Sequence, residues 1–211
     1  MNQIHHADCV ELMKKMPEES VDLVITDPPY LVNYRSRDGR VVPNDNNNRW
    51  LAPAYAQIYR LLKCDSFCIS FYGWHKVDIF FQAWKSTGFR PVGHLVWVKN
   101  YHSKEGFVRY CHESAYLLAK GNPPLPKIAL RDVLDWRYTG NTLHPTQKPL
   151  MAILPLILAY SEAGDIVLDP FAGSGTTATA TQELGRKYIG IEMNQQYCNL
   201  ARERLQKQKR E

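Results

Sequence analysis

The stretch from Ile166 to Glu192 constrains the fold of this chain more than any other. An apolar run, Ile166–Phe171, is followed by a glycine-rich turn, a helix rich in alanine and threonine that ends at Leu184, and a second apolar run, Lys187–Ile191. This order predicts a strand–helix–strand unit, in which the two strands lie parallel in one sheet and the helix covers one face. We therefore expect an α/β fold with a mostly parallel sheet.

The turn of this unit and the acid at the end of its second strand suit a nucleoside ligand. The turn reads Ala172-Gly173-Ser174-Gly175-Thr176-Thr177, and glycine lets a backbone approach a ligand that a Cβ atom would exclude. Glu192 stands roughly 20 residues further on, where a carboxylate can accept hydrogen bonds from both hydroxyls of a ribose. The spacing Gly-x-Gly-x-x-Gly is absent from the turn, which disfavours a pyrophosphate and favours a nucleoside without phosphates.

A second strand exit has the composition of a reactive site. The β-branched run Val21–Thr26 predicts a buried strand. Asp27-Pro28-Pro29-Tyr30 ends it, because neither proline can donate to a sheet ladder. A carboxylate, a stiff turn and an aromatic ring then stand at the carboxyl end of a strand, where open α/β sheets bind ligands. Taken alone, the tetrapeptide is equally compatible with an ordinary strand exit.

Alternating strand and helix patterns fill the rest of the chain, and no repeat or low-complexity tract interrupts them. Strands are expected at residues 3–6, 21–26, 67–72, 92–99, 113–119, 166–171 and 187–191. Helices are expected from about 10 to 17, 52 to 62, 75 to 86, 150 to 160 and 194 to 208. A further helix is expected after the glycine-rich turn, ending at 184. A chain of 211 residues with this pattern is long enough to form one domain with a core of its own.

Composition sets broad limits on partners and location. A formal charge of +5 permits a nucleic-acid partner without proving one. The five cysteines are scattered and lack paired zinc spacing, so we expect a reduced protein without a metal site. The apolar stretch Leu150–Tyr160 is about half a membrane span, and Met1–Met16 lacks a signal-peptide pattern. These features predict a soluble, cytoplasmic protein with no membrane partner.

Together these stretches resemble the S-adenosylmethionine-dependent amino-methyltransferases of DNA, in the class whose catalytic motif precedes its cofactor motif. The matching segments follow the order of that family across almost the whole chain: 27–30, His144-Pro145-Thr146-Gln147-Lys148-Pro149, 169–177 and 190–192. The resemblance implies one methyltransferase domain over residues 1–211, with a Rossmann-like, circularly permuted sheet of seven strands. The first strand, which leads to Asp8, would complete the cofactor half.

The resemblance also implies a role for each residue of the site. Asp27 and the Pro28 carbonyl, held by Pro29, would accept both N–H groups of an exocyclic base amine, which frees the nitrogen lone pair for direct displacement. Tyr30 would stack on the flipped-out base, and Asp8 and Cys9 would help to hold it. Lys148 would pair with the cofactor's carboxylate. The implied cofactor contacts are Asp8, Asp27, Thr146, Lys148, Asp169, Phe171, Ala172, Gly173, Ser174, Gly175, Thr176 and Glu192.

The first residue of the tetrapeptide bears on the choice of base. Asp27 resembles the adenine-N6 enzymes, whereas cytosine-N4 relatives more often carry serine, so adenine in double-stranded DNA is the expected substrate and cytosine the alternative. Relatives that act on RNA or on protein glutamine usually begin this tetrapeptide with asparagine. A DNA-binding module without catalysis is a third hypothesis. The presence of both Asp27 and Glu192, one from each motif, argues against it.

Little of the chain is left to read a target sequence. Relatives with long targets usually carry a sizeable recognition region before the His144–Pro149 motif, whereas here only residues 121–143 are available. We expect this segment, with the arginine-bearing loop 31–50 and the connection 100–112, to read a short or loosely specified target. The connection mixes basic and aromatic residues, which suits nucleic acid but equally a plain hairpin tip. The resemblance further allows a homodimer, a cognate restriction enzyme and association with the nucleoid.

Overall fold

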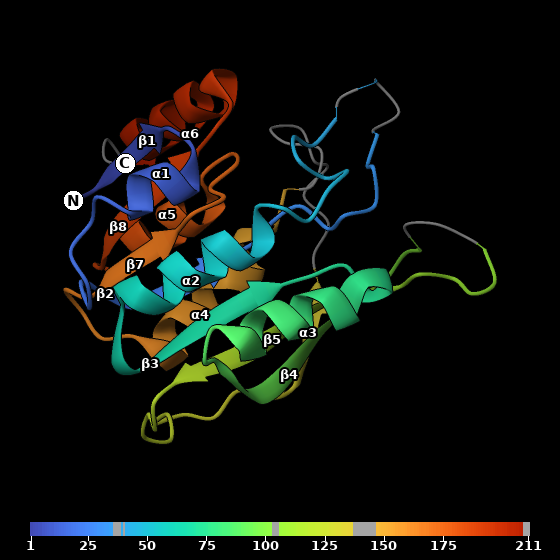
Figure 1. The fold of residues 1–211 in the computed structure, drawn as a ribbon, viewed down its shortest axis with the longest axis horizontal. Helices are drawn as coiled ribbons and strands as arrows, with labels where there is room; N and C mark the ends of the chain where they lie inside the picture. The colour runs from blue at the N-terminus through green and yellow to red at the C-terminus, as the bar shows by residue number, and fades with distance from the viewer. Residues whose placement is uncertain (36–38, 40, 103–105, 137–146, 209–211) are drawn as a thin grey trace.

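The computed structural model describes residues 1–35, 39, 41–102, 106–136 and 147–208. These residues form one sheet in the order β1-β8-β7-β2-β3-β5-β4-β6 (Figure 1). Among the described strands only β5 runs against the others, which confirms the predicted α/β fold with a mostly parallel sheet. The strands are β1 Gln3–His6, β2 Val21–Thr26, β3 Leu62–Phe71, β4 Arg90–Lys99, β5 His112–Lys120, β6 Val133–Trp136, β7 Ile166–Asp169 and β8 Lys187–Glu192.

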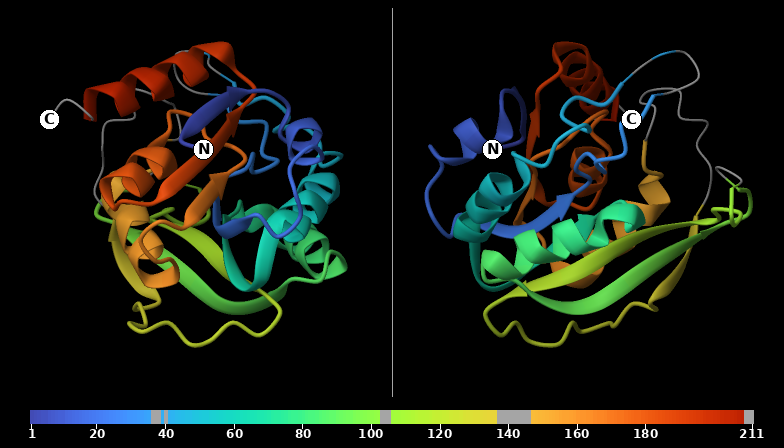
Figure 2. Two further views of the ribbon diagram at one scale, coloured as in Figure 1. Left: turned by 90° about the vertical axis from the view of Figure 1, so that its left-hand side faces the viewer. Right: turned by 45° about the vertical axis from the view of Figure 1, so that its right-hand side comes forward.

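Helices cover both faces of the sheet (Figures 1 and 2). Side chains of β2 alternate between these faces, as a period of two requires: Val24 packs with α1, α2 and α3, whereas Leu23 and Ile25 pack with α4 and α5. No helix in the described ranges is long and apolar enough to cross a membrane. The helices are α1 Cys9–Met13, α2 Leu51–Leu61, α3 Val77–Ser86, α4 Leu150–Tyr160, α5 Thr176–Glu183 and α6 Gln195–Gln208, with a short 3-10 turn, η1, at Trp74–Lys76.

The predicted count of seven strands was wrong by one. Strand β6 lies inside segment 121–143, which the sequence suggested was irregular, and it pairs in parallel with β4 through Val96↔Val133 to Lys99↔Trp136. Four residues are too few to establish a period of two, and only Trp136 of this strand is buried. The pairing of β6 therefore depends on β4, which lies more than 30 residues earlier in the chain.

The two strand exits that the sequence marked as functional are neighbours in the sheet. Strands β2 and β7 pair in parallel, with Leu23 opposite Val167 and Val24 opposite Leu168. Strand β1 pairs in parallel with β8, so the first strand completes the second half of the sheet, as predicted. Helix α6 then packs on β1, where Arg202 Nη2 donates a hydrogen bond of 2.7 Å to the Ile4 carbonyl.

The glycine-rich turn is held by close packing as well as by its backbone conformation. Gly175 precedes α5 with φ = +81°, and a Cβ atom there would lie 2.8 Å from the Ala201 Cβ atom of α6. Gly164 has a similar φ of +89°, but no atom lies within 4 Å of its Cβ position. The two glycines therefore share the conformational requirement, and only Gly175 adds a steric one.

We predict that Gly175→Ala lowers the free energy of unfolding more than Gly164→Ala does. Both substitutions place alanine in the left-handed region, at a cost of about 1 kcal/mol. Gly175→Ala must in addition displace α6, and overpacking of this kind costs roughly 1–3 kcal/mol more. Urea denaturation of the two variants measures the difference. Equal destabilisation would show that α5 and α6 do not pack as tightly as described.

Candidate active site

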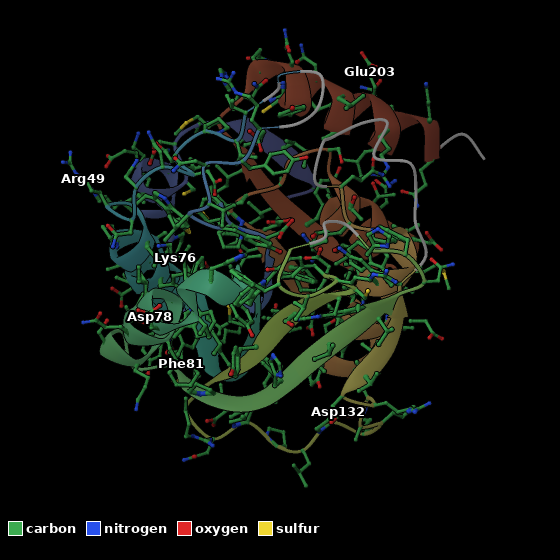
Figure 3. All side chains as sticks on the ribbon, turned by 90° about the vertical axis from the view of Figure 1, so that its right-hand side faces the viewer. Arg49, Lys76, Asp78, Phe81, Asp132 and Glu203 are labelled. Atoms are coloured by element: carbon green, nitrogen blue, oxygen red, sulfur yellow. The ribbon has the colours of Figure 1, made fainter. Side chains whose placement is uncertain are left out.

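A pocket opens at the carboxyl ends of β2, β7 and β8. It collects residues from both predicted motifs and from the start of α1. Figure 3 looks onto this end of the molecule, where Arg49 is labelled at the end of the polar loop that follows Tyr30. The predicted residues that line the pocket are Asp8, Cys9, Asp27, Pro28, Pro29, Tyr30, Lys148, Asp169, Phe171, Ala172, Gly173, Ser174, Thr176 and Glu192.

One predicted residue that the structure describes is not part of this lining. Gly175 is not among the pocket residues, and its contact with Ala201 accounts for the glycine at that position. Thr146 lies outside the described residues.

Asp27 is held by an ion pair and by a hydrogen bond. The Lys148 ammonium donates to both carboxylate oxygens at 2.7 Å, and the Tyr30 hydroxyl donates to Asp27 Oδ1 at 2.9 Å. Lys148 Nζ also lies 3.1 Å from the Tyr30 hydroxyl oxygen. Burial raises the pKa of Asp27. The positive charge of Lys148 and the hydrogen bonds from Lys148 and Tyr30 oppose that rise.

The geometry leaves the Asp27 carboxylate able to accept a further hydrogen bond and keeps the Tyr30 hydroxyl protonated. A carboxylate has about four lone-pair positions, so Asp27 can still accept an N–H from a ligand. Burial and the nearby Asp27 charge raise the pKa of Tyr30 well above its ordinary value, and its hydroxyl therefore stays protonated. In the structure the Lys148 ammonium contacts Asp27, whereas the resemblance had suggested a cofactor carboxylate as its partner.

Glu113 is a second partly buried carboxylate beside this cluster, and it was not identified from the sequence. It accepts a hydrogen bond of 2.5 Å from the Lys99 ammonium, and its Oε2 atom lies 3.5 Å from the Tyr30 hydroxyl oxygen, whose proton is donated to Asp27. Burial raises the pKa of Glu113, but the ammonium groups of Lys148 and Lys99 outweigh burial and lower it overall. At the start of a predicted strand, a glutamate carries no signal that distinguishes it from a surface residue.

The pocket has two halves: the Asp27–Tyr30 tetrapeptide forms the first, and the glycine-rich turn with the end of β8 forms the second. Glu192 organises the second half. Its Oε2 atom accepts from the Gly173 N–H at 2.8 Å, and its Oε1 atom accepts from the Asn194 N–H at 2.7 Å. These bonds fix the glycine-rich turn relative to β8. Each oxygen keeps a further lone pair for a ligand hydroxyl.

Asp169 and Phe171 complete that half. Burial, as the largest cause, raises the pKa of Asp169 to about 7. Its Oδ1 atom accepts from the Phe171 N–H at 3.1 Å. The Phe171 ring meets Trp50 edge to face, with centroids 5.1 Å apart, and both rings line the pocket.

The loop after Tyr30 forms one wall of the pocket and depends on Asp45. The Asp45 carboxylate accepts backbone hydrogen bonds from Leu31 at 2.6 Å, Val32 at 3.3 Å and Tyr34 at 2.6 Å. Asp45 is only 3% exposed. The sequence predicted a functional loop here but not this residue. The three N–H groups lie 11 to 14 positions before Asp45, so no local pattern in the sequence signalled this role.

Asp8 and Cys9 contribute from the start of α1. Asp8 caps the helix by accepting a 3.0 Å hydrogen bond from the Glu11 N–H. Burial raises the pKa of Cys9 to about 12, so its thiol stays protonated at neutral pH. Across the described ranges no group of three or more His, Cys, Asp or Glu residues could hold a metal ion.

Comparison with known proteins assigns the family. Residues 21–203 match the N6/N4 methyltransferase family, described as DNA methylase. YubD of Escherichia coli (strain K12), whose name describes it as a candidate methylase, is 50% identical over 205 residues, which cover 97% of this chain and 90% of YubD. The DNA adenine methyltransferase YhdJ of the same strain is 33% identical over 246 residues, which cover 96% of this chain and 82% of YhdJ.

A solved structure agrees with these relatives. The crystal structure of the M1.HpyAVI–SAM complex is 28% identical and superposes with a TM-score of 0.77, covering 96% of this chain and 98% of that one. The family match and the relatives extend over both halves of the pocket. This chain therefore belongs to the N6/N4 family of DNA methylases.

Proposed function

We propose that this protein transfers a methyl group from S-adenosylmethionine to the N6 amine of adenine in double-stranded DNA. The observation that carries this proposal is the shared pocket: the Asp27–Tyr30 tetrapeptide and the glycine-rich turn line the same cavity, because β2 and β7 are paired. One half then suits a base amine and the other a nucleoside. The M1.HpyAVI–SAM complex, which has the same fold, supports the choice of cofactor.

The residues of the second half fit S-adenosylmethionine. Asp169 is a buried carboxyl group that could accept the cofactor's ammonium, and Glu192 keeps lone pairs for the ribose hydroxyls. Gln147 Oε1 lines the same pocket and is buried without a hydrogen-bond partner among the described residues, so it offers a further acceptor. Bound there, the cofactor supplies an electrophilic methyl group on a sulfonium sulfur.

The residues of the first half prepare the amine. Asp27 and the Pro28 carbonyl accept its two N–H groups, which localises the nitrogen lone pair. The negative charge of Asp27 stabilises the positive charge that develops on that nitrogen in the transition state. Tyr30 stacks on the base after it leaves the duplex, and its anchored hydroxyl fixes the ring. Asp8 and Cys9 line the pocket on the side of α1 and help to hold the base.

Lys148 has to share its charge between two partners in this scheme. While it contacts both oxygens of Asp27, it compensates part of the charge that should stabilise the amine. A carboxylate on the bound cofactor would draw the ammonium away from Asp27. This is the partner that the sequence suggested for Lys148.

Adenine is proposed over cytosine for two reasons. The tetrapeptide begins with Asp27, and the relative YhdJ is named a DNA adenine methyltransferase. The chemistry of the pocket suits both amines, since each needs the same acceptors. Cytosine-N4 methylation is therefore the alternative, and it belongs to the same family.

Target recognition is assigned to loops 31–50, 100–112 and 121–143 of a single domain. Residues 36–38, 40, 103–105 and 137–146 lie outside the described part of the chain. Strand β6 takes Val133–Trp136 into the sheet, so the segment before the Gln147–Pro149 motif has even fewer residues free to read DNA. A homodimer and a cognate restriction enzyme remain predictions.

We predict that DNA treated with the enzyme contains N6-methyladenine and no N4-methylcytosine. Mass spectrometry of the hydrolysed nucleosides measures both. Single-molecule sequencing of the same DNA should locate the modification in a short or degenerate site, because few residues are available to specify a long one. Finding only N4-methylcytosine would contradict the adenine assignment, and a long, strictly defined site would contradict the assignment of the recognition loops.

Asp27→Ala should strongly reduce the rate of methyl transfer while leaving S-adenosylmethionine binding within about twofold of wild type. Loss of one preorganised acceptor lowers kcat by roughly 100- to 1000-fold. Single-turnover kinetics and calorimetric titration of the cofactor separate the two effects. Glu162→Ala is the matched control, since Glu162 is an exposed carboxylate that pairs with Lys127 at the surface. Loss of cofactor binding in Asp27→Ala would show that the tetrapeptide belongs to the half of the site that binds the cofactor, which would contradict its assignment to the base.

S-adenosylmethionine should bind more tightly as the pH rises from 5.5 to 7. Asp169, with a pKa of about 7, is mostly neutral at the lower pH and becomes ionised as the pH increases. If the ionised form attracts the cofactor's ammonium, the affinity should rise by about tenfold. Titrations at several pH values measure this slope. Asp169→Asn should bind more weakly and without the slope, and an unchanged slope would exclude Asp169 as its origin.

A further inference from the structure

Three aromatic rings lie together at the exit of β3. Two belong to the turn Trp74–Lys76, where the sequence suggested no functional residue, and the third belongs to the connection 100–112. Trp74 and His75 of η1 stack with ring centroids 3.8 Å apart and planes at 24°. Tyr110, from the connection between β4 and β5, lies 5.7 Å from Trp74, again with planes at 24°. We call Trp74, His75 and Tyr110 the aromatic platform.

Gly73, the residue before the platform, packs against Tyr30, which lines the pocket. Its φ of −82° is an ordinary value, so backbone conformation does not require glycine here. A Cβ atom at this position would lie 2.8 Å from Tyr30 Cβ and 2.9 Å from the Tyr30 carbonyl oxygen, closer than real atoms approach. The missing side chain lets η1 pack directly on the residue proposed to stack on the target base.

His75 and Tyr110 do not enclose the Trp74 ring between them. The His75 and Tyr110 centroids are only 6.3 Å apart. That is far less than the sum of their distances to Trp74, so the two rings do not lie on opposite faces of the indole. Trp74 is 47% exposed. A large ring that is stacked on one side and exposed beside a pocket suits a partner with a flat aromatic face.

Basic residues stand next to the platform residues in the sequence. Lys76 belongs to the same turn, and Figure 3 labels it at the start of α3, on the end of the molecule that carries the pocket, near Asp78. Arg109 precedes Tyr110 and is exposed, and His112 begins β5. Cations beside exposed aromatic faces match a nucleic-acid strand, whose phosphates bind the cations while its bases stack.

We propose that the aromatic platform stacks on a DNA base next to the target base in the same strand. This contact would hold the strand at the mouth of the pocket while the target base lies against Tyr30. The inference rests on the proposed function, which makes DNA the partner. It extends the recognition loop 100–112, which supplies Tyr110, by Trp74 and His75 of the turn after β3, a segment outside the three recognition loops.

Equilibrium binding to duplex DNA tests the platform. Fluorescence anisotropy with a labelled duplex that carries the mapped methylation site, in the absence of cofactor, measures Kd for wild type, Trp74→Leu and Trp74→Phe. Trp74→Leu keeps an apolar side chain but has no aromatic face, and we expect its affinity to fall on the order of tenfold. Trp74→Phe should restore most of that loss.

Two further readouts distinguish stacking from other roles. Trp74→Leu should leave the slope of log affinity against log salt concentration unchanged, because no phosphate contact is lost. Lys76→Ala should reduce that slope by about one if Lys76 contacts a phosphate. Trp74→Leu should also leave S-adenosylmethionine binding unchanged. Leu158→Ala, which truncates an exposed apolar side chain on α4, is the control and should bind DNA as wild type does.

Several results would overturn the platform. These are wild-type affinity in Trp74→Leu, an equal loss in Trp74→Phe, or a parallel loss of cofactor binding that indicates a structural role. Methylation by the wild type is measured in parallel. If the wild type methylates DNA but Trp74→Leu binds normally, the platform alone is wrong. If the wild type neither binds nor methylates DNA, the proposed function and the platform are both wrong.

Discussion

Parallel pairing of β2 with β7 is the constraint on which the rest of the structure depends. The register sets Val24 opposite Leu168, and both strands are buried, so they bring Asp27 and Asp169 to the same edge of the sheet. Each half of the site needs only a short turn after its strand. Because both turns start from the packed centre of the sheet, their positions are fixed more firmly than loops alone would allow.

Two buried ammonium groups and two partly buried carboxylates meet at and beside the pocket, and stability alone does not explain why these charges are retained. Asp27 and Glu113 face Lys148 and Lys99, so the charges balance, and Tyr30 contacts both carboxylates. Taking such groups out of water costs free energy, and apolar replacements of similar size are often as stable. Breaking one pair is costly, however, because it leaves a buried charge without a partner. A cluster of this kind fixes the position of Tyr30 and the charge of Asp27, which is what the proposed chemistry requires.

Two segments at the carboxyl edge are shaped by contacts that are not visible as motifs. The Asp45 carboxylate gathers three backbone N–H groups and turns a polar loop into a wall of the pocket. Gly73 does the opposite, since its lack of a side chain lets η1 approach Tyr30. A carboxylate in one loop and a missing side chain in the next thus determine what surrounds the bound base in the proposed mechanism.

By itself the sequence determined the strand–helix–strand unit, the mostly parallel sheet and the two motifs at its edge. Those features follow from local physics: β-branched runs favour strands, prolines end them, and glycines permit tight turns. Only the tertiary structure decided that β6 joins the sheet, that Glu113 faces Tyr30 and that Lys148 pairs with Asp27. Lys148 and Asp27 are 121 positions apart, and β6 has no pattern of its own. Such contacts depend on which distant segments the packed sheet brings together, and no local pattern specifies that.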